Sequence, residues 1–140
     1  MSRRHSKKKI LSEAQQAIRT RIEQCESIVE LVAIGNEYIE TEPVQAARAY
    51  RKALLKQHND GVVINNLGVA YWNMGNHGEA LKEFEKAKRL LPDDANVVNN
   101  FASALLNSGQ QDKARHWFKK AAGLTPAKHT FLAYIDLHGY

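Results

Sequence analysis

The sequence repeats itself at a spacing of 34 residues, and this periodicity limits its possible folds more than any other feature. Residues 61–94 and 95–128 match at ten positions. The matching pairs are Ile64 and Val98, Leu67 and Phe101, Gly68 and Ala102, Tyr71 and Leu105, Gly75 and Gly109, Ala80 and Ala114, Phe84 and Phe118, Ala87 and Ala121, Leu90 and Leu124, and Pro92 and Pro126. A more divergent unit precedes them, matching at Ala46, Tyr50 and Ala53 and, with one residue fewer in its turn, at Ile34, Gly35 and Tyr38.

Within a unit, the apolar residues have the spacing of two α-helices. The first helix carries apolar or small residues at i, i+3, i+4 and i+7, which are Ile64, Leu67, Gly68 and Tyr71. The second helix carries Ala80, Phe84 and Ala87. One such unit cannot bury both of its faces, so the pattern predicts that the units stack on one another.

Glycine and proline occupy places that suit the turns between these helices. Gly75 and Gly109 fall where the first helix must stop, a position that favours a left-handed backbone. Pro92 and Pro126 fall where we expect the next helix to begin. Each unit is therefore predicted to be helix, tight turn, helix, short turn.

The sizes of the residues that recur every 34 positions also predict how the helices pack. Gly68 facing Ala80 would let the two helices of one unit approach closely. Phe84 and Phe118 would fill the wider gap toward the neighbouring units. We therefore expect both phenylalanines to be buried.

The pattern resembles the tetratricopeptide repeat (TPR) family over residues 27–128. It is most complete in residues 61–94, which carry Leu67, Gly68, Tyr71, Gly75, Ala80, Phe84, Ala87 and Pro92. The unit at 27–60 departs from it, with His58 in the proline place and no glycine in its turn. The resemblance implies an all-α, right-handed solenoid of helical hairpins with about eight helices.

The flanking segments complete the predicted domain organisation. Residues 1–9 are a basic tail, and residues 10–140 form a single domain. Within that domain, residues 10–26 form an amphipathic N-terminal helix, and 27–60, 61–94 and 95–128 are the repeats. Residues 129–140 form a C-terminal capping helix, because residues 130–137 have the composition of the first helix of another unit.

The net charge of +5 resides in the tail. Five basic residues and no acidic residue lie there: Arg3, Arg4, Lys7, Lys8 and Lys9. Basic and acidic residues balance in the remainder of the chain. We expect the tail to be solvated and mobile, although it could also contact nucleic acid, acidic lipid or an acidic protein through salt-sensitive charge contacts.

No residue pattern indicates catalysis, a metal or a cofactor. The six histidines show no recognised ligand spacing, and the single cysteine, Cys25, has no partner for a disulfide. No phosphate-binding loop or nucleophile motif is present. The apolar runs are too short to span a membrane, and no secretory leader is visible, which predicts a cytoplasmic protein that is not an enzyme.

Asparagine recurs on the predicted first helices of the two best units. Asn65, Asn66 and Asn73 have partners 34 residues later at Asn99, Asn100 and Asn107. The resemblance implies that first helices line a concave groove, where ligands lie. The candidate peptide-binding residues are Asn65, Asn66, Val69, Trp72, Asn73, Asn96, Asn99, Asn100, Ser103 and Asn107.

Two interpretations of the asparagines stay open. In the first, each amide binds the backbone of an extended ligand, with Trp72 as an anchor, as in the asparagine ladder of the glycosyltransferase that attaches N-acetylglucosamine to proteins. In the second, the amides tie neighbouring helices together and Trp72 packs against an adjacent helix. Asn36 and Asn66 also suit the asparagine places of the clamp that grips chaperone C-termini, but its cationic places would hold Val32, Asn96 and Asn100.

The resulting prediction is an adaptor that binds a protein or peptide partner. One alternative is a secretion chaperone or co-chaperone with three such repeats. Another is a nucleic-acid or ribosome-associated factor that acts through the basic tail. A short stack with an incomplete last unit could also associate with a copy of itself.

Overall fold

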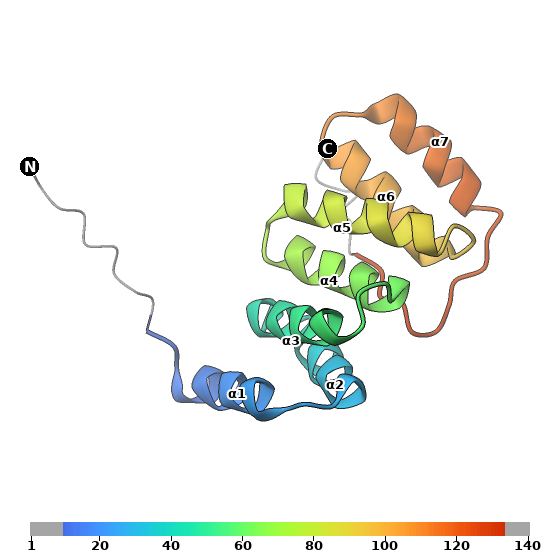
Figure 1. Cartoon of the computed structure of the whole chain (residues 1–140). Helices are drawn as coiled ribbons and strands as arrows, with labels where there is room; N and C mark the ends of the chain where they lie inside the picture. The colour runs from blue at the N-terminus through green and yellow to red at the C-terminus, as the bar shows by residue number, and fades with distance from the viewer. Residues whose placement is uncertain (1–9, 134–140) are drawn as a thin grey trace, which may run out of the picture.

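The computed structural model describes residues 10–133 and contains seven helices in this part of the chain (Figure 1). They are α1 (Glu13–Gln24), α2 (Ile28–Tyr38), α3 (Pro43–Lys56), α4 (Gly61–Asn73), α5 (His77–Leu90), α6 (Ala95–Asn107) and α7 (Gln111–Ala121). Residues 10–133 form no strand beyond one isolated bridge between Asp94 and Thr125. The prediction of an all-α fold is confirmed.

The helices form three stacked hairpins. Helices α2 and α3, α4 and α5, and α6 and α7 pack as pairs, while α3 contacts α4 and α5 contacts α6 (Figure 1). Helix α1 precedes the stack and contacts mainly α3. It begins after Ser12, which closes a reciprocal cap with Gln15, and Ile10 lies outside the helix with 90% of its surface exposed.

The turn chemistry explains where the helices begin and end. Gly75 and Gly109 have φ angles of +82° and +84°, the left-handed conformation expected at these two turns. Helix α3 begins directly on Pro43, although its turn lacks a glycine. Pro92 lies before α6 rather than at its first residue, because Asp94 forms the N-cap.

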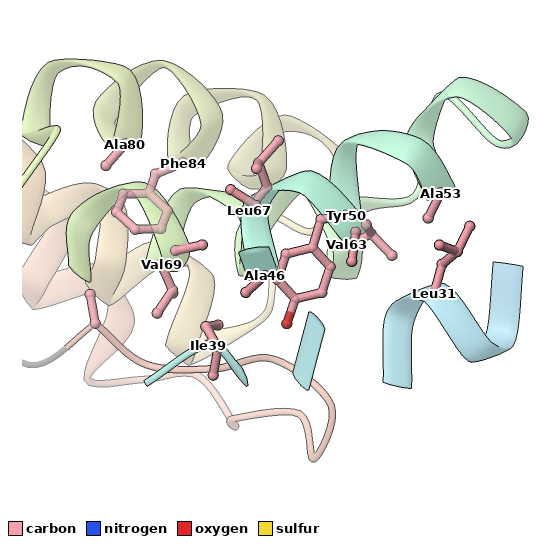
Figure 2. Close-up of a cluster of buried hydrophobic side chains, with 14 of the residues drawn as sticks. Leu31, Ile39, Ala46, Tyr50, Ala53, Val63, Leu67, Val69, Ala80 and Phe84 are labelled. Atoms are coloured by element: carbon pink, nitrogen blue, oxygen red, sulfur yellow. The ribbon is translucent and has the colours of Figure 1, made fainter. Parts of the chain in front are cut away.

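Two large rings of the core pack within their own hairpins, although the sequence predicted that Phe84 would face the neighbouring units. Tyr50 of α3 and Phe84 of α5 are fully buried, and both point toward the first helix of their own hairpin (Figure 2). Phe118, predicted to be buried in the same way, is only partly buried. The reason is that no further hairpin follows α7 in the described residues to cover it.

The segment after α7 differs from the predicted capping helix in the part that the structure describes, residues 129–133. Residues 130–133 are not helical, and Pro126 is not followed by a helix in the described residues. The backbone groups of this segment bond to side chains of α4 and α6, which takes the place of helical hydrogen bonding. The tail at 1–9, which was predicted to be mobile, lies outside the described residues, and so do residues 134–140 of the predicted capping helix.

Candidate peptide-binding groove on α4 and α6

The first helices of the second and third hairpins face a non-helical stretch of the chain itself. We call residues 127–133 the C-terminal segment. After leaving α7, the chain turns back, and this segment lies beside α4 and α6 (Figure 1). Because it passes over the residues predicted to bind a ligand, its contacts show what these side chains can hold.

Asn66 of α4 binds the backbone on both sides of Thr130. Its Nδ2 donates to the carbonyl of His129 at 3.1 Å, and its Oδ1 accepts from the N–H of Phe131 at 3.0 Å. One side-chain amide thus satisfies a backbone acceptor and a backbone donor, as a neighbouring strand would.

Asn100 of α6 does the same two residues further along. Its Nδ2 donates to the carbonyl of Phe131 at 2.9 Å, and its Oδ1 accepts from the N–H of Ala133 at 2.8 Å. These two hydrogen bonds lie on either side of Leu132 in the chain, as those of Asn66 lie on either side of Thr130. We call the side-chain amides of Asn66 and Asn100 the two amide clamps.

Asn65 joins the two amide clamps to each other. Its Nδ2 donates to Asn66 Oδ1 and to the Phe131 carbonyl, both at 3.0 Å, and its Oδ1 accepts from Asn100 Nδ2 at 2.8 Å. The side chains of Asn65, Asn66 and Asn100 are fully buried. Unbonded amides there would cost about 1–3 kcal/mol for each lost partner, so the network holds each amide in one orientation.

A second set of contacts binds the side chain of Thr130. Its hydroxyl donates to Asp94 Oδ2 at 3.0 Å and lies 3.2 Å from Asn96 Nδ2, which also donates to the Thr130 carbonyl at 3.0 Å. Asp94 simultaneously caps α6 by accepting from the N–H of Asn96 at 2.9 Å. Thr130 is 6% exposed, so this hydroxyl is held in a buried polar place.

Other predicted groove residues have different surroundings. Val69 is buried and, with Asn73, Ile39 and Phe131, lines a pocket of about 430 Å³ beside the segment. Asn73 Nδ2 donates to the carbonyl of Ile39 at 2.9 Å, which ties α4 to the first hairpin.

The remaining predicted residues do not join the two amide clamps. Ser103 donates to the carbonyl of Asn99 at 2.6 Å within α6, and Asn107 is exposed at the end of that helix. Trp72 is partly buried, and its ring lies 4.1 Å from that of His77 and 6.5 Å from that of Phe84, both on α5. These contacts place Trp72 against the second helix of its own hairpin.

The asparagine predicted for the first hairpin is also engaged. Asn36 Oδ1 accepts from the hydroxyl of Tyr50 at 2.7 Å. Burial raises the pKa of Tyr50 far above its ordinary value, so this hydroxyl stays protonated. Asn36 therefore serves the packing of α2 on α3.

Sequence reasoning missed the partners that the segment supplies. Asp94 repeats Asp60 at the 34-residue spacing and was recognisable only as a helix cap. The composition around Thr130, Phe131 and Ala133 favours a helix, whereas contacts with α4, α6 and Asn96 determine where these residues lie.

Between residues 10 and 133, no group of three or more His, Cys, Asp and Glu side chains could hold a metal ion. None of the seven described helices has the length and apolar character needed to cross a membrane.

Comparisons with known proteins agree on the repeats. Family models of the tetratricopeptide repeat match residues 62–94 and residues 95–128. No curated protein sequence matches this chain significantly.

Solved structures of MamA share the fold. A single-substitution mutant of MamA is 23% identical, with a TM-score of 0.65 over 80% of this chain and 83% of that one. MamA from AMB-1 is 23% identical, with a TM-score of 0.67 over 78% of this chain and 61% of that one. MamA from MSR-1 is 25% identical, with a TM-score of 0.65, and 63% of its length is covered.

The periodic sequence, the stacked hairpins and the two model matches lead to one assignment. The chain is a tetratricopeptide repeat protein, and residues 62–128 hold the two repeats that the family models match.

Proposed function

We propose that this protein–protein interaction module binds an extended segment of a partner protein in the groove formed by α4 and α6. The observation that supports the proposal is the pair of amide clamps. Asn66 and Asn100 already bind backbone N–H and C=O groups of a non-helical segment at 2.8–3.1 Å. A partner backbone of similar conformation offers the same groups.

Binding through the two amide clamps depends on the backbone of the ligand more than on the charge of its side chains. The amides of Asn65, Asn66 and Asn100 are neutral, and the places suited to a cationic clamp hold Val32, Asn96 and Asn100. An acidic C-terminus is therefore a poor ligand. Because neutral hydrogen bonds are screened little by salt, affinity for a groove ligand should change little with ionic strength.

A library of displayed linear peptides, panned against the full chain, tests this function. We expect enriched peptides to lose binding when the two amide clamps are removed by Asn66→Ala and Asn100→Ala together. Asn59→Ala is the matched control, because Asn59 is an exposed asparagine in the loop between α3 and α4.

The salt dependence of the enriched peptides gives a second measurement. Binding that survives removal of both amide clamps would contradict the proposal. Affinity that falls steeply with salt would instead favour the basic residues Arg3, Arg4, Lys7, Lys8 and Lys9, which lie outside the described residues.

A further inference from the structure

The C-terminal segment uses the same atoms that a partner backbone would need. Both ends of the Asn66 amide and both ends of the Asn100 amide are bonded to it. An amide offers one acceptor and two donors, and the Asn65 contacts use part of what remains. A second extended chain therefore cannot occupy the two amide clamps until the segment has left them.

The segment also shows which side chains the groove accepts. Thr130 and Ala133 are 6% and 2% exposed, whereas Leu132 is 56% exposed. The Thr130 place offers a carboxylate acceptor from Asp94 and an amide donor from Asn96, which together fit a hydroxyl. The Ala133 place is enclosed and fits a small residue.

The connection to α7 would allow the segment to leave without unfolding a helix. Most of residues 122–129 are exposed, including Pro126 and Lys128. Leaving breaks the side-chain contacts of residues 127–133 with α4 and α6. It leaves the hairpin contacts between α4 and α5 and between α6 and α7 in place.

We propose that residues 127–133 are an intramolecular occupant that blocks the groove, and that the partner which displaces them is an extended segment of matching pattern. That pattern is a serine or threonine at the place of Thr130 and a small residue at the place of Ala133. The inference rests on the proposed function, because it names the ligand class and the regulation of the same groove.

The test measures how a labelled synthetic peptide with the sequence of residues 127–133 binds to the full chain. Ala133→Pro removes the N–H that donates to Asn100 and should release the segment. Since apparent affinity scales with the fraction of open groove, we expect the peptide to bind this variant about tenfold or more tightly than wild type. Thr130→Val, which removes the hydroxyl bonded to Asp94, should act in the same direction.

Matched controls separate the segment from general effects on the fold. Lys128→Ala changes an exposed residue of the same segment and should leave peptide affinity as in wild type. In the peptide, a methyl group on the nitrogen equivalent to Phe131 should weaken binding about tenfold or more, because it removes the donor to Asn66. The same methyl group on the nitrogen equivalent to Leu132 is its control.

Different outcomes separate a failure of the blocked-groove proposal from a failure of the proposed peptide-binding function. If wild type and both segment variants bind the peptide equally, and Asn66→Ala abolishes this binding, the inference is overturned. The groove would then remain a binding site. No binding by any variant would overturn both. Wild-type dimers that disappear in Ala133→Pro would show that the segment occupies the groove of another copy, which would overturn the intramolecular assignment.

Discussion

Gly68 of α4 leaves room for the ring of Phe84 on α5: a Cβ atom at position 68 would lie 2.6 Å from Phe84 Cε1. The same relationship occurs one hairpin earlier, where a Cβ on Gly35 would collide with the ring of Tyr50. In each of these two hairpins, the aromatic ring of the second helix therefore lies against a backbone without a side chain. This contact explains why glycine recurs inside two helices, where it is otherwise unfavourable.

Gly68→Ala should destabilise the protein. Alanine is a better helix former than glycine, which would stabilise the protein by about 1 kcal/mol. Overpacking against the fully buried ring of Phe84 should cost about 1–3 kcal/mol. We expect a lower urea midpoint, corresponding to a net loss of up to about 2 kcal/mol. Gly78→Ala is the control, because a Cβ at this position of α5 meets no atom within 4 Å, and it should be neutral or stabilising. A stabilised Gly68→Ala protein would contradict the proposed contact.

Phe84→Ala should be far more costly than Phe118→Ala. Phe84 is fully buried, so truncation should lower the free energy of unfolding by about 3–5 kcal/mol. Phe118 occupies the equivalent place in the last hairpin but is partly exposed, so the loss should be about 1–2 kcal/mol. Denaturant unfolding of both variants measures the difference. Equal losses would mean that another element covers Phe118 in solution.

Tyr50 should make stability depend on alkaline pH. Burial raises the pKa of its hydroxyl above the ordinary value of 10.0, so the folded state keeps a proton that the unfolded state loses. This contribution is fully present below about pH 10.0 and decreases as pH rises through the folded pKa.

The matched variant for this prediction is Tyr50→Phe. Near neutral pH it should cost about 0.5–1.5 kcal/mol, because the hydrogen bond to Asn36 is lost while the exposed Asn36 amide can bond to water. In unfolding experiments above pH 10.0, wild-type stability should fall more steeply than that of the variant. Parallel curves would show that Tyr50 ionises normally in the folded protein.

Local spacing was enough to predict the helices of the repeats but not the last segment. The 34-residue matches located α4 to α7 because each helix carries its own apolar period and its own cap or turn residue. Residues 130–137 have a helical composition as well, yet residues 130–133 are not helical. Their backbone is bonded by asparagines more than 30 positions earlier in the chain, a preference that no local pattern records.

The sequence marks the asparagines as an unusual set, but it does not divide them by the contacts that their side chains make. Spacing alone could not separate Asn66 and Asn100, which hold backbone, from Asn73, which ties α4 to the carbonyl of Ile39. Asn73 fits the interpretation in which amides tie neighbouring elements together, and ligand binding by Asn66 and Asn100 stays a prediction. Solvent exposure, which distinguishes buried Asn100 from exposed Asn107, depends on the stacked hairpins.

Asn100→Ala should lower stability and release the C-terminal segment together. The substitution removes the donor to the Phe131 carbonyl and to Asn65 Oδ1, and the acceptor for the N–H of Ala133. Because Asn65 and Asn100 are fully buried, the groups left behind lose their partner out of reach of water, which costs about 1–3 kcal/mol. Amide hydrogen exchange at Ala133 should accelerate in the same variant. Asn107→Ala alters an exposed residue of the same helix and should change stability by less than about 0.5 kcal/mol. If the Ala133 amide of Asn100→Ala exchanged as slowly as in wild type, contacts other than the amide clamp would be holding the segment.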